Sequence, residues 1–142
     1  MKKLLFTTIL ALFGFTLAGL VAGCGPSKPK VDVAAQLQAL KSGDVNAKCD
    51  ALAAIASAGP AAAAAVPQVM EELKNSDALV RRLAVLALGQ IGAPAATPAL
   101  PELRKLMEDG DRDVARNALN SVKAIDPKGP EAKSPNMPNV MP

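Results

Sequence analysis

Two cysteines and one run of aspartates are the residues that could do chemistry in this chain. The 142-residue sequence contains no histidine, and Cys24 and Cys49 are its two cysteines. Ordinary zinc and haem sites, which draw on histidine and grouped cysteines, therefore have no ligand set here. Neither a nucleophile elbow nor a phosphate-binding glycine loop occurs. We therefore expect no catalytic residues, no metal site and no cofactor.

The run Asp109-Gly110-Asp111-Arg112-Asp113 comes nearest to a metal-binding motif. It resembles the start of a calcium loop, in which carboxylates alternate along a tight turn. A glutamate should close such a loop at its twelfth position, which here is Asn120. We favour the other interpretation, an acidic helix start, because the helix dipole and amide capping both stabilise carboxylates there.

Cys24 stands at the end of a segment with the parts of a secretory signal peptide. Met1-Lys2-Lys3 is basic, and residues 4–21 are apolar or small. Leu20-Val21-Ala22-Gly23-Cys24 resembles the lipobox of bacterial lipoproteins. This resemblance implies cleavage after Gly23, a diacylglycerol thioether on the Cys24 sulfur and acylation of the new amino group. The alternative is a transmembrane anchor, since 18 residues lie at the lower limit for crossing a bilayer.

The charge and aromatic content change once the signal peptide is set aside. Lys2 and Lys3 account for two of the three excess positive charges, which leaves a net charge of +1. Residues 31–126 carry 10 basic and 12 acidic side chains, so no positive surface for nucleic acid is expected. All three phenylalanines lie in the signal peptide, and no aromatic side chain remains on which a base or sugar could stack.

Proline-rich segments on both sides mark the limits of the folded part. Residues 24–30 begin with the lipidated cysteine and are expected to form a flexible tether. Residues 127–142 contain five prolines and little to bury, and we expect them to be disordered. One small domain of residues 31–126 remains between them.

An internal repeat organises this domain. Asp44, Asp77 and Asp111 are 33 and 34 residues apart, and each follows one apolar stretch and precedes another. After Asp77 the residues Val80, Ala84, Leu88 and Ile91 recur at offsets that place them on one helical face. The aspartates are well placed to cap helix N-termini, and Gly59-Pro60 and Gly92-Ala93-Pro94 to end two of the helices. The sequence thus predicts an all-α fold of three stacked helical hairpins, with units at about 31–60, 61–93 and 94–126.

The middle unit resembles a HEAT repeat, of the short type also found in phycobilin lyases. The most specific part is the spacing of Asp77, Val80-Arg81, Ala84, Leu88-Gly89 and Ile91-Gly92. The first unit departs with Ala47-Lys48, and the third with Ala115 in place of the arginine. The resemblance implies a short right-handed α-solenoid, whose terminal units are expected to be atypical. Tetratricopeptide repeats have a similar period but normally carry aromatic residues, which are absent from residues 31–126.

Cys49 has no second thiol within the domain to pair with. We interpret it as an inert, partly buried thiol, and a covalent dimer through Cys49 is the alternative. The leucines and valine that fill the second helix of the middle unit between the Val80 stripe positions are expected to extend the core. They are Leu79, Leu83, Val85 and Leu86.

A binding surface is predicted on the second helices, which line the concave side of a HEAT stack. Positions opposite the Val80 stripe should be exposed there, and counting 100° per residue gives partner-binding candidates Arg82, Leu86, Arg116, Asn120 and Lys123. Cys49 and Ala53 hold the same places in the first unit, so this surface should change from small and neutral to basic. It suits a partner that offers carboxylates around an apolar anchor.

The function predicted is therefore that of a non-enzymatic protein-interaction or assembly module, tethered to a membrane on the extracytoplasmic side. A structural envelope lipoprotein without a specific ligand remains an alternative, and so does a chromophore-handling relative of the phycobilin lyases. Gly25 follows the lipidated cysteine, where the lipoprotein resemblance implies that an aspartate would retain the protein in the inner membrane. Outer-membrane residence is therefore expected if the host is diderm.

Overall fold

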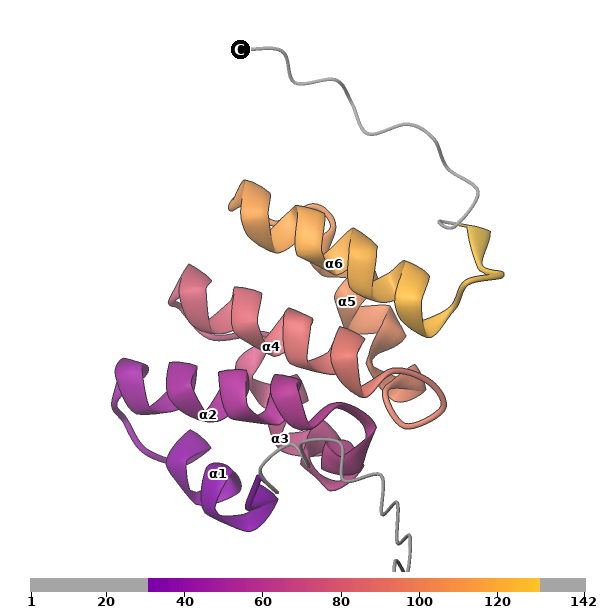
Figure 1. Ribbon diagram of the computed structural model, residues 1–142. Coiled ribbons are helices and arrows are strands. Elements are labelled where there is room, and N and C mark those ends of the chain that lie inside the picture. The colour runs from indigo at the N-terminus through magenta and orange to yellow at the C-terminus, as the bar shows by residue number, and fades with distance from the viewer. Residues whose placement is uncertain (1–30, 131–142) are drawn as a thin grey trace, which may run out of the picture.

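The computed structural model describes residues 31–130, and every regular element in this part is helical (Figure 1). Six α-helices form three hairpins in chain order, which confirms the all-α prediction. They are α1 (Val33–Leu40), α2 (Val45–Ala58), α3 (Val66–Glu72), α4 (Ala78–Ile91), α5 (Leu100–Leu106) and α6 (Arg112–Ile125). Two 3₁₀ segments, η1 (Gly59–Ala65) and η2 (Thr97–Ala99), lead into α3 and α5. The proposed signal peptide, Cys24, the tether and most of the predicted tail lie outside the described residues.

The helices are arranged in two layers. The second helices of the hairpins, α2, α4 and α6, lie side by side in one layer, and α4 packs against both of the others (Figure 1). The first helices, α1, α3 and α5, form the layer behind and each pack on the second helix of the same hairpin. The middle helix α4 is therefore covered on three sides and open on the fourth.

Each second helix begins at the aspartate that the repeat predicted. Asp77 accepts from the backbone N–H of Leu79 at 2.8 Å, and Asp111 accepts from that of Asp113 at 2.9 Å. Asp44 caps α2 in the same way. The helices α2 and α4 are followed by Gly59 and Gly92, whose φ angles of 58° and 70° are left-handed values that favour glycine. The start and stop signals of these helices are confirmed.

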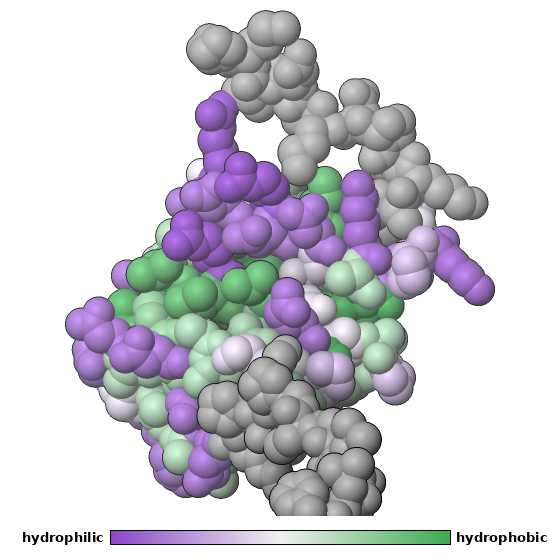
Figure 2. Space-filling model, viewed as in Figure 1, coloured by the Kyte–Doolittle hydropathy of each residue, from purple (hydrophilic) through white to green (hydrophobic). Residues whose placement is uncertain are grey.

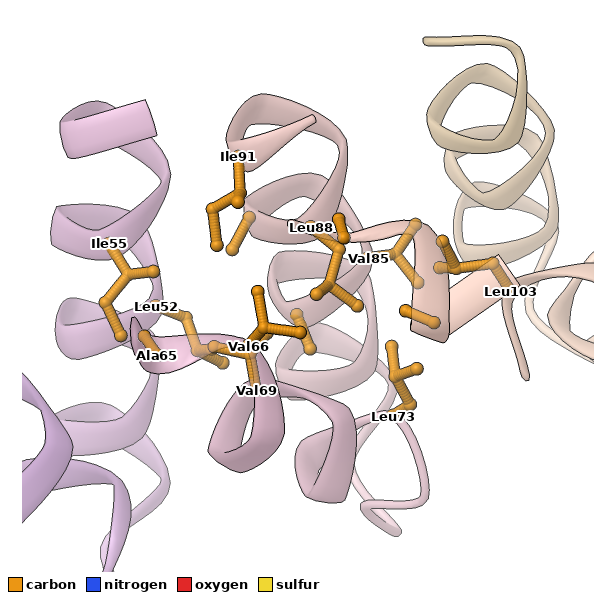
Figure 3. Packing of buried hydrophobic residues seen from close by; sticks show 14 of the residues in the cluster. Leu52, Ile55, Ala65, Val66, Val69, Leu73, Val85, Leu88, Ile91 and Leu103 are labelled. Carbon is orange, nitrogen blue, oxygen red and sulfur yellow. The ribbon is translucent and has the colours of Figure 1, made fainter. Parts of the chain in front are cut away.

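The predicted helical phase is also confirmed, because Val80, Ala84, Leu88 and Ile91 are at most 1% exposed. In Figure 3, Leu88 and Ile91 of α4 point into the space that Leu52 and Ile55 of α2 share with Val66 and Val69 of α3. The prediction that the core extends around α4 is correct for Val85, which is 0% exposed. It is wrong for Leu79 and Leu86, which are 42% and 39% exposed because no element covers the fourth side of α4.

Small residues let α4 and α6 approach closely. A methyl group on Gly89 of α4 would lie 2.5 Å from the Oγ of Ser121 on α6, closer than side chains approach one another. The same Ser121 hydroxyl donates a hydrogen bond of 2.9 Å to the carbonyl oxygen of Val85, one turn earlier on α4. Because glycine and serine are small, the backbones of α4 and α6 lie close together. This close packing adds dispersion contacts, which partly compensate for the small side chains of an alanine-rich core.

Ion pairs link each unit to the next. Lys48 of α2 contacts Glu72 of α3 at 2.7 Å, and Arg81 of α4 contacts Asp109 in the loop before α6 at 3.0 Å. Arg81 also donates to the carbonyl oxygens of Asn75 and Ser76 in its own unit. Lys48 and Arg81 hold the same repeat position, so the first unit keeps the bridge although its cation and its partner differ.

One stretch of the folded part, Val45–Glu72, is long and apolar enough to pass for a membrane span by length and composition. In the structure this stretch is not one straight helix but α2, the segment η1 and α3, with non-helical backbone angles at Ala62. Its apolar residues include Leu52, Ile55 and Val69, which are buried in the domain core. Their hydropathy is thus accounted for by helix packing.

Candidate interaction surface

The five residues predicted to bind a partner come from two neighbouring helices, Arg82 and Leu86 from α4 and Arg116, Asn120 and Lys123 from α6. All five lie outside the core. Leu86, Arg116 and Asn120 are exposed, and Arg82 and Lys123 are half-buried. Because α4 and α6 lie side by side in one layer, their outward faces form parts of one surface (Figure 1).

A carboxylate lies among the predicted basic residues. Asp113 of α6 contacts Arg116 at 2.6 Å and Arg82 at 3.4 Å, so both guanidinium groups share this one carboxylate. Sequence reasoning treated Asp113 only as part of an acidic helix start, because the contact with Arg82 joins residues 31 apart in the chain. The surface therefore carries a mixed charge network.

Three leucines form an apolar line on the outward side of α4, which we call the α4 ridge: Leu79, Leu83 and Leu86. Leu79 and Leu86 are the two most exposed large apolar side chains of the described residues, and Leu83 is half-buried between them. Figure 2 shows an apolar band at the place of α4, with hydrophilic side chains over α6 and mostly small, weakly apolar ones over α2. An apolar centre with a polar rim is the usual anatomy of a protein interface.

The neighbouring units show that the fold does not require these leucines. At the same distances from the capping aspartate, α2 carries Asn46, Asp50 and Ala53, and α6 carries Asp113, Asn117 and Asn120. Hairpins of the same shape thus place polar or small residues at all three positions. Leu83 packs partly against the core, but the exposed Leu79 and Leu86 are not explained by the packing of their own hairpin.

A shallow hollow opens at one end of the α4 ridge. It has a volume of about 280 Å³ and is lined by Ala78, Leu79, Arg82 and Asp111, between the first turns of α4 and α6. Its walls combine an apolar side chain with one cation and one carboxylate. The hollow thus extends the ridge as a place where a side chain of a partner could insert.

Comparison with known families assigns the fold. A family model described as HEAT repeats matches residues 33–123, which is well over half of the chain. The chain belongs to the HEAT-repeat family. No curated protein matches it. HEAT repeats are helical units that commonly mediate contacts between proteins, and an outward-facing ridge on the second helices is consistent with that use.

The acidic loop of this HEAT-repeat domain is occupied by structural contacts. Asp109 binds the Arg81 guanidinium through both carboxylate oxygens, and Arg81 holds the pKa of that carboxyl below its usual range. Asp111 caps α6, and Asp113 contacts Arg82 and Arg116. No cluster of possible metal ligands occurs among residues 31–130. The interpretation of these aspartates as an acidic helix start accounts for their contacts.

Cys49 lies on α2 at the repeat position that Arg82 holds on α4. It is a free thiol of intermediate exposure, as expected for a partly buried cysteine. Burial raises the pKa of this thiol, and the carboxylate of Asp77 raises it further. A raised pKa keeps the thiol protonated, and a protonated thiol is a poor nucleophile. The electrostatics around Cys49 therefore agree with an inert role.

Proposed function

We propose that this HEAT-repeat protein is an interaction or assembly module, tethered to a membrane on the extracytoplasmic side, and that the outward face of α2, α4 and α6 binds another protein. The observation that supports the binding face is the α4 ridge, since both flanking units replace its leucines by polar or small residues. Covering Leu79 and Leu86, each about 40% exposed, would contribute about 1 kcal/mol per side chain.

The charged residues beside the α4 ridge, Arg82, Asp113 and Arg116, determine which partner surfaces can bind. Arg82 and Arg116 already share Asp113, so a partner carboxylate would join this network rather than neutralise a free cation. Contacts of this kind set orientation and select partners more than they add affinity. We therefore expect the leucines to dominate the binding energy and the network to fix the register.

The tether is supported by sequence alone. A basic start, an apolar run and a lipobox-like ending at Cys24 precede the domain. Two or more acyl chains anchor a protein stably, at about 0.8 kcal/mol per buried methylene, where a single chain does so marginally. Attachment through Cys24 would confine the binding face near the bilayer, and Gly25 favours the outer membrane in a diderm host.

Replacing Cys24 tests the tether. In cells, Cys24→Ala should leave an uncleaved precursor and abolish the mass that lipid adds, as measured by intact-protein mass spectrometry of the membrane fraction. Cys49→Ser is the matched control and should keep the lipid mass. If the wild-type chain carries no lipid and washes off membranes with salt, the proposed anchoring is wrong.

Photo-crosslinking in intact cells tests the binding face. A photoreactive amino acid at position 86, on the α4 ridge, should capture a protein, whereas the same group at position 71 should not. Glu71 is exposed on α3 in the opposite layer, so it serves as the matched control. Equal capture at both positions, or none at position 86, would leave the alternative of a structural envelope lipoprotein without a specific ligand.

A further inference from the structure

We propose that a second copy of this chain covers the α4 ridge, related to the first by a two-fold axis that runs parallel to α4 between the two ridges. This inference rests on the proposed function, because it names the protein that the face binds. Three features of the face support it: the spacing of the ridge, the contrast between its two flanks, and the heights of two opposite charges.

The spacing of the ridge fits a helix as occupant. Leu79, Leu83 and Leu86 are separated by four and then three residues, and Gln90 follows four residues later. This is the alternation of a coiled-coil seam, in which one helix meets another nearly parallel to it. The buried stripe of α4 instead follows offsets of four, four and three, which fit the packing inside the domain. A two-fold axis along α4 would place each ridge leucine opposite its own copy.

The two flanks of the ridge differ in size. On the α2 side the outward residues include Ala53 and Asn46, and on the α6 side they include Arg116 and Asn120. The proposed axis exchanges these sides, so that α2 of one copy faces α6 of the other. Short side chains on α2, such as Ala53, leave room for the long side chain of Arg116 on the opposing α6. A dimer with α2 facing α2 would instead leave a gap there, and α6 facing α6 would bring Arg116 towards its own copy.

Charges on the two flanks are complementary and lie at matching heights. Asp50 is exposed on α2, six residues after the cap Asp44, and makes no ion pair within residues 31–130. Arg116 is exposed on α6, five residues after the cap Asp111. A symmetry axis parallel to α4 preserves height, and the two residues differ by one in their distance from the caps, so both lie in the second turn of their helices. The Asp50 carboxylate of each copy can then reach the Arg116 guanidinium of the other.

The size of the face limits the strength of this dimer. Each second helix has 14 residues and is about 21 Å long. Three such helices about 9 Å apart present roughly 600 Å² on each copy. The total of about 1,200 Å² lies at the lower end of specific interfaces, so a weak dimer is expected. Tethering both copies to one bilayer would raise their local concentration.

The symmetry agrees with such tethering. Because α1 runs back along α2, the start of α1 lies near the C-terminal end of α2 (Figure 1). An axis parallel to α4 leaves this end of both copies pointing in the same direction. The first helices of both copies would therefore start on the same side of the dimer, which suits two proteins anchored in a single membrane.

Oxidative crosslinking in membranes from cells that express the full chain tests the dimer. In a Cys49→Ser background, we expect Leu86→Cys and, separately, Leu79→Cys to give a disulfide-linked dimer on addition of copper phenanthroline, because each lies opposite its own copy. The Cys49→Ser chain without a new cysteine and the chain with Glu71→Cys are the controls and should stay monomeric. Monomer at both ridge positions, with helicity unchanged, would overturn the proposal.

A charge exchange tests the orientation. Because the symmetry doubles every change, Asp50→Lys or Arg116→Glu alone should reduce the crosslinked fraction at position 86 about tenfold. Together they should restore it to within about twofold of the parent. Single variants that crosslink as well as the parent would refute the exchanged flanks. If photo-crosslinking at position 86 captures a different protein and no dimer forms, the second-copy inference fails while the proposed binding function stands.

Discussion

The close approach of α4 and α6 predicts that Gly89→Ala destabilises the domain, although alanine is the better helix former. Gly89 lies inside α4, and its backbone angles are not left-handed, so the helix itself would accept a side chain. Alanine in place of glycine should then stabilise an isolated helix by about 1 kcal/mol. The neighbouring helix decides the outcome in the folded domain.

The added methyl group would lie 2.5 Å from the Oγ, 3.0 Å from the Cβ and 3.2 Å from the Cα of Ser121. Rotating the hydroxyl away relieves the first contact but breaks the hydrogen bond to the Val85 carbonyl, which costs about 1 kcal/mol. The contact with Cα involves backbone, so α6 must also shift, and overpacking of this kind costs about 1–3 kcal/mol. After the helix gain is subtracted, we expect a loss of about 1–3 kcal/mol in the free energy of unfolding.

Thermal unfolding followed by circular dichroism at 222 nm, on a chain that starts at Gly25, measures this effect. A loss of this size should lower the melting temperature by roughly 5–15 °C in a domain of about 100 residues. Gly110→Ala is the matched control, because nothing lies within 4 Å of its Cβ position, and should change little. Adding Ser121→Ala to Gly89→Ala should recover part of the loss. A Gly89→Ala chain as stable as the wild type would refute the close contact.

Two further predictions concern the links between units and the core. The pKa of Asp109 is lowered, chiefly by its hydrogen bonds with Arg81, so its stabilising contribution should be present above the unfolded-state pKa of about 3.9 and be lost as the pH falls below it. Urea unfolding at a series of pH values should therefore show a steeper loss as the pH falls below about 4 for the wild type than for Asp109→Asn. An equal slope for the two chains would assign the acid sensitivity to other carboxylates. Leu88→Asp should cost about 4 kcal/mol or more and abolish most of the helical signal at 37 °C, since Leu88 is fully buried, whereas Leu86→Asp at an exposed position should not.

Local signals in the sequence sufficed to predict the hairpins. Asp44, Asp77 and Asp111 are spaced one repeat apart, and each caps a helix through contacts with residues two and three positions away. The phase of α4 follows from the apolar offsets after Val80, because a helix fixes which residues share a face. Features that depend on nearby residues were therefore predictable without knowledge of the packing.

Contacts between units were not predictable in the same way. The bridge from Arg81 to Asp109 spans 28 residues, and that from Arg82 to Asp113 spans 31. Their geometry depends on how one hairpin is placed on the next, which no local pattern encodes. The sequence identifies Lys48 and Ala115 only as departures from the repeat pattern. The structure shows that Lys48 keeps the bridge by contacting Glu72 at the end of α3, whereas repeat spacing indicates Asn75 in the loop after α3.

The α4 ridge shows how the repeat itself could have corrected the prediction. Leu79, Leu83, Val85 and Leu86 were assigned to the core because an apolar helix in the middle of a stack is expected to be covered on several sides. Helical phase, in contrast, placed Leu86 among the exposed candidates. In the structure Val85 is buried and Leu83 packs partly against the core, whereas Leu79 and Leu86 are exposed. A two-layer stack, however, always leaves the outward side of each second helix open, whatever residues it carries. Comparing the three units at equal distances from their caps shows polar or small residues at these positions in α2 and α6. Since these flanking helices need no apolar residue there, the exposed Leu79 and Leu86 of α4 support a contact from outside the hairpin stack.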